Sequence, residues 1–342
     1  MRDGRWLVGY GLAGVSYPFY QVPCQARASV RHDGSAYVRS AATDIGTGTY
    51  TVMTQLAAEL LGLDVARVRF DLGDSDMPYA PQAGGSGLTG ALSNAVHAAC
   101  RRLVREFLDV VRDDTESPLH AAALDDVTVT DGRIHRIGDP ARGETYTEIL
   151  TRHGLEELSA DGRSTPPQAE ELGMALSGAF GAKFVEVRLD PELGLLRVAR
   201  VVSAIDGGRI LNEKTATSQI VGGISQAMFE ETATDQGTGR IANATFGDYL
   251  MPVSADVPDM EVLLVGGPDR ATAVGTKGSV RSVWSAWPRP SAMPSSTPLD
   301  AASARFRSPS TSSCSERPAS RPMSRGAVLV AGATVRRRIA PP

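Results

Sequence analysis

Apolar and polar residues follow two different periods along the first 160 residues. Where every second residue is apolar we predict strands, and where apolar residues recur every third or fourth position we predict helices. Two Asp-Gly pairs lie between strand-like segments, which is typical of β-hairpins. The predicted elements are a hairpin over 26–44, a helix over 49–62 that ends at Gly62, a strand within 64–74, a helix over 91–111, and a hairpin of strands 127–130 and 134–137.

The second half of the chain continues with the same two periods. Two strands are predicted within 181–208, joined by a turn that contains proline and glycine, and a later strand within 241–265. A helix is predicted over 213–233, although Gly222 and Gly223 in its middle each cost about 1 kcal/mol relative to alanine. These glycines indicate close approach of another backbone or of a ligand, and helix–helix packing would explain them equally well.

The order of these elements predicts a mixed α+β fold without internal repeats. Between the two halves, the polar stretch 159–173 is rich in Ser, Pro and Glu. Such composition is typical of a linker, and this stretch is the best candidate for one.

Composition and charge then exclude several classes of protein. The chain has 342 residues and a formal net charge of −4, which favours neither nucleic acid nor an anionic membrane as a partner. No apolar run approaches the length of a membrane span, and the first residues lack the order of a signal peptide, so we expect a cytoplasmic protein. Cys24, Cys100 and Cys314 show no paired spacing, which argues against a disulfide framework, a zinc site or an iron–sulfur cluster in this chain.

Two glycine-rich loops carry the clearest chemical signal. Residues 44–51, DIGTGTYT, and residues 84–90, GGSGLTG, both lead from a predicted strand or loop into a helix. Backbone N–H groups at such junctions can bind phosphates and other anions, helped by the helix dipole. Simple turns have the same pattern, and neither loop has the spacing of a Walker loop or of a dinucleotide-binding fingerprint. The five histidines are scattered and form no hydrolase or metalloprotease motif.

Several segments, taken in order, resemble one known family. They are WLVGYGLA, DIGTGTYTVMTQLAAELLGL, RVRFDLGDSDMPYAPQAGGS, SNAVHAAC, FVEVRLDPELGLLRVARVV, DGGRILNEKTATSQIVGGISQAM, DYLMPVSADVP and VGTKG. From about residue 5 to residue 278 the chain is similar to the C-terminal half of the molybdenum-cofactor-binding subunit of the xanthine dehydrogenase/aldehyde oxidase family. The resemblance implies two molybdopterin-binding lobes, 1–160 and 179–278, joined by a linker over 161–178.

The resemblance also implies an activity, cofactors and partners. The family hydroxylates aldehydes or N-heterocycles at a molybdenum–molybdopterin centre, with a glutamate as the general base. The cytosine dinucleotide form of the cofactor is expected here. Electrons leave through 2Fe–2S clusters and FAD, which are expected on separate partner subunits, an iron–sulfur subunit and an FAD subunit.

Carried over by position, the resemblance implies seven cofactor-binding residues in three segments. Many relatives have glutamine at the position of Thr47 and glutamate at the position of Val221, so the sequence departs from the family there. The implied contacts are Ile45, Gly46, Thr47 and Gly48 in the first glycine loop, Gly85 and Ser86 in the second, and Gln219 in the helix over 213–233.

The resemblance also reveals what is missing. The family subunit is roughly twice as long, and nothing here resembles its N-terminal half, so Met1 is expected to correspond to the middle of that subunit. The catalytic glutamate is expected shortly after Lys277-Gly278, but Ser279, Val280 and Arg281 follow instead. No catalytic residue is therefore assigned, no metal ligand is expected from this chain, and we expect the chain alone to be inactive.

Beyond Lys277 the composition changes abruptly. Residues 279–342 contain ten arginines and no lysine, with Asp300 and Glu316 as the acidic residues. If residues 282–300 are read one base out of frame, suitable synonymous codons give GLVGVAAAIGNAVFHATG, which resembles the last helix of the family subunit. We therefore predict that 279–342 is an out-of-frame translation, and a basic disordered arm is the alternative. In that alternative the chain would be a non-catalytic scaffold or the product of a pseudogene.

Overall fold

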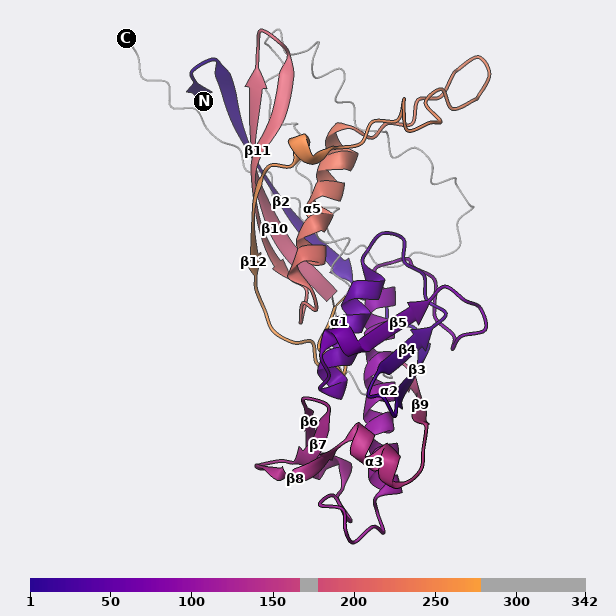
Figure 1. The fold of residues 1–342 in the computed structure, drawn as a ribbon. Coiled ribbons are helices and arrows are strands. Elements are labelled where there is room, and N and C mark those ends of the chain that lie inside the picture. The colour runs from indigo at the N-terminus through magenta and orange to yellow at the C-terminus, as the bar shows by residue number, and fades with distance from the viewer. Residues whose placement is uncertain (167–177, 278–342) are drawn as a thin grey trace, which may run out of the picture. The chain divides into compact units, whose positions relative to one another are not determined.

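The computed structural model describes residues 1–166 and 178–277, all of which belong to one unit (Figure 1). These residues form three sheets with helices packed against them, so the predicted α+β class is confirmed. The predicted out-of-frame tail, 279–342, lies outside the described residues, as does most of the predicted linker. The division into two lobes stays a prediction.

A four-stranded sheet in the order β5-β4-β3-β9 carries the first core. Strand β3 pairs antiparallel with both β4 and β9, and β4 pairs parallel with β5, so the predicted hairpin over 26–44 is confirmed. The parallel pair is joined through helix α1, as parallel strands require a crossover connection. The bounds are β3 Cys24–Arg31, β4 Ala36–Ser40, α1 Thr49–Leu61, β5 Val68–Leu72, α2 Leu88–Val110 and β9 Glu157–Ser164.

Both predicted helices of this part form where their apolar spacing places them. Helix α1 ends at Gly62, which has a left-handed φ of 58° and caps the helix through its backbone N–H. Helix α2 buries one apolar face, including Leu92, Val96, Leu103 and Phe107, against β3 and β9. Burial of these side chains is the main source of stability in this core.

Strand β9 corrects the linker prediction at its start. Residues 159–164 belong to this strand, and its buried positions are the small residues Ala160 and Gly162. A Cβ atom at Gly162 would lie 2.1 Å from the backbone nitrogen of Ala99 in α2, so the strand and the helix are packed too closely for any side chain there. The exposed positions between are polar, which made the segment resemble a linker in sequence.

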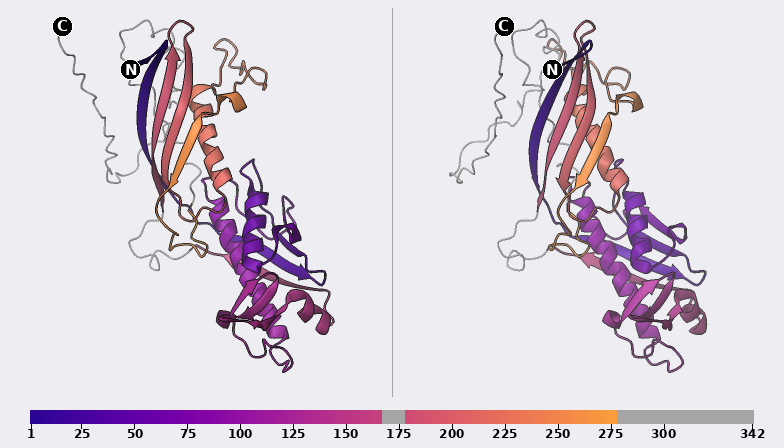
Figure 2. Two further views of the ribbon diagram at one scale, coloured as in Figure 1. Left: turned by 60° about the vertical axis from the view of Figure 1, so that its left-hand side comes forward. Right: turned by 90° about the vertical axis from the view of Figure 1, so that its left-hand side faces the viewer.

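A five-stranded sheet in the order β1-β2-β10-β11-β12 carries the second core. Helix α5 lies along one face of it (Figures 1 and 2), and Val185, Val201, Ile205, Ile220 and Ile224 fill the space between. The predicted hairpin within 181–208 and the later strand are confirmed. The bounds are β1 Arg2–Asp3, β2 Trp6–Pro18, β10 Gly178–Asp190, β11 Leu195–Asp206, α5 Glu213–Met228 and β12 Asp259–Leu264.

Strand β2 and helix α5 of this core differ from what the sequence predicts. Strand β2 was not predicted, and it pairs along its length with β10, so residues 6–18 share a sheet with strands that follow the predicted linker. Helix α5 ends at Met228 rather than near residue 233. A Cβ atom at Gly222 would meet no heavy atom of residues 1–166 or 178–277 within 4 Å, so close approach of another backbone in this part of the chain does not explain this glycine.

A third, three-stranded sheet and a short helix complete the described fold. The predicted hairpin around Asp131-Gly132 is confirmed as β6 paired with β7. Arg152 at the end of α3 donates to Glu144 in β8 and to Asp114, 2.8 Å away, in the loop that follows α2. The bounds are β6 Val127–Thr130, β7 Arg133–Arg136, β8 Asp139–Thr145 and α3 Tyr146–Arg152, with 3-10 helices at Val65–Arg67, Leu124–Asp126 and Ser254–Asp256.

The two cysteines in the described part of the chain are free and buried. Burial raises the pKa of the Cys24 thiol to about 11 and that of the Cys100 thiol to about 12. Both therefore behave as small core residues rather than as nucleophiles or ligands. Among helices within 1–166 and 178–277, none combines the length and apolar character needed to cross a membrane.

Candidate functional site

Three segments that are far apart in sequence surround one cavity of about 240 Å³. They are the loop that precedes α1, the loop that precedes α2, and the segment that leads into α5 together with its first two turns. Residues Thr276 and Lys277 complete the wall. The cavity thus lies where three helices begin, and helix N-termini favour anionic groups.

The loop before α1 presents side chains to the cavity rather than backbone N–H groups. The Asp44 carboxylate accepts hydrogen bonds from the backbone of Gly46 at 2.9 Å, Gly48 at 3.2 Å and Tyr50 at 3.3 Å. Burial raises the pKa of Asp44, but these N–H groups outweigh it and hold the pKa below its usual range. Since Asp44 already occupies these donors, the side chains of Ile45 and Thr47 form this wall.

Gly48 also fixes how closely two helix N-termini approach. Its φ of 79° is left-handed, and a Cβ atom there would lie 2.9 Å from the Thr215 methyl group of α5. A larger residue would be strained and would push α5 away from α1. Gly48 therefore maintains the shape of the cavity without lining it.

The loop before α2 leads into a helix whose N-cap residue, Gly87, has no side chain to cap it. Gly85 and Ser86 both have left-handed φ angles, 59° and 56°, which turn the chain into the helix. The N-cap residue Gly87 provides no side-chain hydrogen bond to the first turn. The cavity wall includes Gly84, Gly85, Ser86, Leu88 and Thr89, so α2 begins at this wall, and its N-cap residue provides no capping side chain.

Helix α5 contributes polar side chains from one face of its first two turns. Asn212 caps the helix by accepting from the Thr215 backbone at 2.9 Å and donates to Gln55 of α1 at 2.8 Å. Gln219, one turn further along, lines the cavity. Its amide makes no hydrogen bond with the described residues and is available to a ligand.

Both cations that line the cavity are paired with acids. Arg209 donates to both carboxylate oxygens of Glu59 at 2.6 Å. The Lys277 ammonium lies 2.8 Å from Asp206 and 3.9 Å from Asp269, and its side chain is 12% exposed. The cavity therefore offers helix N-termini and neutral polar groups rather than free positive charge.

The loop that ends in Lys277 is attached to both cores. The Thr276 hydroxyl lies 3.3 Å from the Ser93 hydroxyl of α2, and the Val274 backbone donates to Asn94 at 3.4 Å. The Lys277 backbone donates to the carbonyl of Gly207 at 3.1 Å. These contacts hold the last described residues against the cavity wall.

Five of the seven residues implied by the family resemblance line this one cavity: Ile45, Thr47, Gly85, Ser86 and Gln219. Gly46 and Gly48 lie in the same loop but not on the wall, and Val221 of α5 is also away from it. Sequence reasoning missed Asn212, Thr215 and Lys277. An asparagine directly before a helical pattern is an N-cap signal and could have indicated the first of these.

No metal centre is evident within residues 1–166 and 178–277, where no group of three or more His, Cys, Asp or Glu side chains converges. The expected position of a catalytic glutamate, shortly after Lys277-Gly278, lies outside the described residues. Within the described residues, the cavity therefore combines three helix N-termini with neutral polar groups.

The class defined by this arrangement is a cofactor-binding protein with an α+β fold and a cavity at three helix N-termini. The chain belongs to the molybdopterin cofactor-binding domain family, whose family model matches residues 1–258. The predicted family is thereby confirmed.

Two relatives from Escherichia coli K12 show how much of a subunit this chain represents. It is 34% identical over 292 residues to the aldehyde oxidoreductase molybdenum-binding subunit PaoC, covering 81% of this chain and 37% of the relative. It is 29% identical over 294 residues to the putative xanthine dehydrogenase molybdenum-binding subunit XdhA, with the same two coverages. The chain thus spans little more than a third of the length of these relatives.

Solved structures support the fold. Quinoline 2-oxidoreductase from Pseudomonas putida 86 matches with a TM-score of 0.67 at 24% identity, over 82% of this chain and 37% of that chain. The Cu,Mo-CO dehydrogenase matches with a TM-score of 0.66 at 21% identity and similar coverage. At such identities the likeness concerns the fold alone.

Proposed function

We propose that this chain forms part of the molybdenum-binding subunit of a cytoplasmic molybdenum hydroxylase. In this proposal the cavity at the starts of α1, α2 and α5 holds molybdenum–molybdopterin in its cytosine dinucleotide form. The observation that carries the proposal is the convergence of Ile45, Thr47, Gly85, Ser86 and Gln219 on one cavity from three distant segments.

The donor set of the cavity fits a phosphate-bearing group. The uncapped start of α2 offers backbone N–H groups and the positive end of a helix dipole, which suit a phosphate. The Gln219 amide can both donate and accept, as recognition of a pterin or pyrimidine edge requires. At about 240 Å³ the cavity is smaller than sites that enclose a whole drug-sized ligand, so it would hold part of a dinucleotide cofactor.

When bound, the cofactor would supply the redox centre for oxidative hydroxylation of an aldehyde or an N-heterocycle. The residues of this chain would bind and orient it: the start of α2 a phosphate, Gln219 a polar ring edge, and Ile45 an apolar face. The ion pair between Lys277 and Asp206 would hold Thr276 against the cofactor, since it fixes the loop that carries this residue.

The chemical step needs a general base, and this chain does not provide the expected one. Where a glutamate is expected after Lys277-Gly278, the sequence continues with Ser279. We therefore propose that the chain binds the cofactor but does not turn over substrate by itself. In an intact assembly, electrons would leave through an iron–sulfur subunit and an FAD subunit.

The proposal is tested by expressing the full chain in a host that makes the cofactor and measuring what co-purifies. Bound molybdenum is measured by mass spectrometry, the pterin by fluorescence after oxidation, and CMP after acid hydrolysis. We expect all three in equal amounts. Molybdenum and pterin without CMP would exclude the dinucleotide form, and a folded chain with none of the three would favour a non-catalytic scaffold.

A pair of variants on one helix locates the site. Gln219→Leu removes a side chain that lines the cavity, and Gln226→Leu changes an exposed glutamine two turns further along α5. We expect Gln219→Leu to weaken retention of the cofactor about three- to tenfold, the value of one lost hydrogen bond, and Gln226→Leu to have no effect. Equal retention in both variants would place the cofactor elsewhere.

A further inference from the structure

Four charged side chains form a row across the four-stranded sheet, on the face opposite its buried alanines and valines. In the strand register Asp71 of β5 lies beside Arg39 of β4, Arg39 beside Arg27 of β3, and Arg27 beside Asp161 of β9. The two arginines are thus direct cross-strand neighbours of like charge. Such a pair is unfavourable unless a negative charge compensates it.

Neither acid of the row forms an ion pair or a hydrogen bond with Arg39. Asp71 is bound by Arg69 of its own strand, with Nε 2.6 Å from the carboxylate. Asp161 is bound by Arg27 through two hydrogen bonds, at 2.6 Å and 2.7 Å. Arg39 has no hydrogen-bonding or ion-pair partner among the described residues.

The pKa of Asp161 reflects the same imbalance. The hydrogen bond from Arg27 lowers this pKa most, and the charges of Arg102 and Arg39 lower it further, against the opposing effect of burial. The charges of three guanidinium groups therefore act on one carboxylate, which pairs with that of Arg27. An excess of positive charge remains on this part of the sheet.

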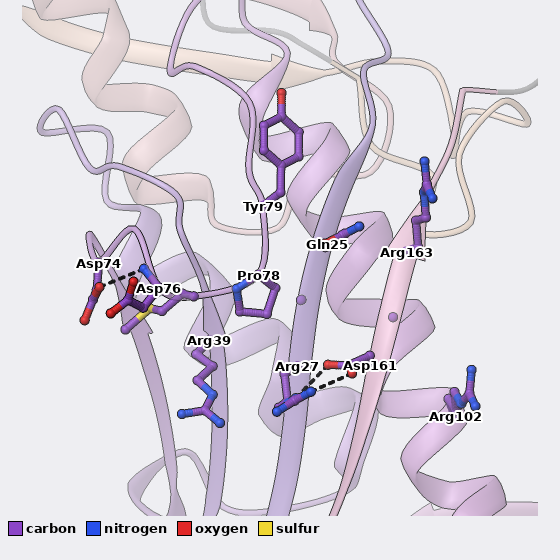
Figure 3. Close-up of a pocket in the computed structure, with 13 residues that line it drawn as sticks. Gln25, Arg27, Arg39, Asp74, Asp76, Pro78, Tyr79, Arg102, Asp161 and Arg163 are labelled. Carbon is purple, nitrogen blue, oxygen red and sulfur yellow. Dashed lines mark hydrogen bonds and ion pairs between the residues drawn. The ribbon is translucent and has the colours of Figure 1, made fainter.

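This excess lies on the wall of a pocket of about 720 Å³, which shares no lining residue with the cofactor cavity. Figure 3 shows Arg39 and Arg27 on neighbouring strands, with Asp74 and Asp76 on one side of them and Arg102 and Arg163 on the other. The volume lies in the range of small-molecule sites.

We propose that this pocket binds a small molecule through one carboxylate or phosphate group, which Arg39 and Arg27 hold between them. An oxyanion placed there would relieve the repulsion between the two guanidinium groups and accept charge-assisted hydrogen bonds from both. Asp74 and Asp76 would repel a second anionic group on their side of the pocket. The remainder of the ligand is therefore neutral or positively charged.

Titration calorimetry of the full chain tests the proposal, with inorganic phosphate and acetate as probes at constant ionic strength. We expect saturable binding of at least one probe at one site, and the stronger probe identifies which oxyanion the pocket prefers. Absence of saturable binding for both would overturn the proposal.

Three variants separate this pocket from other anion sites. Arg39→Gln should weaken binding about tenfold, because it removes one charged donor. Asp161→Asn should strengthen binding severalfold, because it releases Arg27 from its carboxylate. Arg31→Gln is the matched control, since Arg31 lies on the same strand face but pairs with Glu157 at 3.1 Å outside the pocket.

The variants also exclude an alternative position for the probe. Phosphate bound at the start of α2 in the cofactor cavity would be insensitive to Arg39→Gln and Asp161→Asn, and that result would refute the proposal. Arg39 is exposed, so its replacement should not disturb folding, which circular dichroism of each variant verifies. A change of equal size in Arg31→Gln would indicate general charge attraction and would also refute it.

Discussion

The buried ammonium group of Lys183 in β10 destabilises the fold, and a single substitution should remove this effect. The side chain is fully buried, and its ammonium group has no hydrogen-bond acceptor among the described residues. It lies opposite Ser203 of β11, whose hydroxyl also lacks a partner in that part of the chain, and two residues before the core residue Val185. Lys183→Met keeps the length of the side chain and replaces the buried charge with a thioether, so we expect a more stable fold.

The size of the effect follows from the pKa of this lysine. Burial lowers the pKa of Lys183 from 10.5 to about 8 in the folded chain. Below pH 8 the ammonium is charged in both the folded and the unfolded chain, and its burial costs the fold about 3 kcal/mol. Between pH 8 and 10.5 the unfolded chain binds more protons than the folded one, so the free energy of unfolding rises with pH and the cost disappears.

Urea denaturation of the full chain, followed by far-ultraviolet circular dichroism, measures this at pH 7 and pH 9.5. At pH 7 we expect Lys183→Met to raise the free energy of unfolding by about 1–3 kcal/mol. At pH 9.5 its advantage over the wild type should shrink by about 2 kcal/mol, because most of the wild-type lysine is then neutral in the fold. The difference between the two proteins cancels other groups that titrate in this range.

Two results would refute this reasoning. A variant less stable than the wild type at pH 7 would mean that the ammonium has a favourable partner in solution. An advantage that stays constant from pH 7 to pH 9.5 would mean that the pKa of Lys183 is not lowered by burial.

Two further predictions concern packing and the ion pair of a buried carboxylate. Gly162→Ala should destabilise the fold by at least about 2 kcal/mol, because the new methyl group would overlap the backbone of α2. Gly222→Ala, by contrast, meets open space among the described residues and should stabilise α5 by about 0.5–1 kcal/mol. Thermal and urea denaturation of both variants test this, and similar effects of the two substitutions would contradict the geometry. Arg152→Ala should cost about 1–3 kcal/mol, because it leaves the carboxylate of Glu144 buried without its cation. Burial raises the pKa of Glu144, but Arg152 and Ser117 outweigh it and lower the pKa. The contribution should therefore be present at neutral pH and disappear as the pH falls through the acidic range, and a pH-independent loss would contradict it.

Elements whose signals are local could be predicted from the sequence. The hairpins at Asp33-Gly34 and Asp131-Gly132 and the end of α1 at Gly62 depend on residues that are adjacent in the chain. Strand β2 could not be predicted in this way, since glycines interrupt its apolar positions and its partner β10 lies about 170 residues later. Strand β9 could not be recognised from its sequence, because its buried positions hold only the small residues Ala160 and Gly162 and therefore show no apolar alternation.

In the candidate site, too, local sequence signals could be predicted, whereas contacts that depend on the folded chain could not. Both glycine loops were evident in the sequence, and they do line one cavity. That Asp44 would take up the backbone N–H groups of its loop depends on the folded path of residues 44–50, which no spacing encodes. Likewise, the ion pair of Lys277 with Asp206 joins residues 71 positions apart.

The pairing of β2 with β10 has a consequence for synthesis on the ribosome. The four-stranded sheet with α1 and α2 can close once residue 164 has emerged, whereas β2 has to wait for residues 178–189 before its partner exists. During that interval an early strand with exposed positions such as Tyr10 and Leu12 presents an unpaired edge. Translation speed between these two points would therefore affect how much of the chain reaches its fold rather than aggregating.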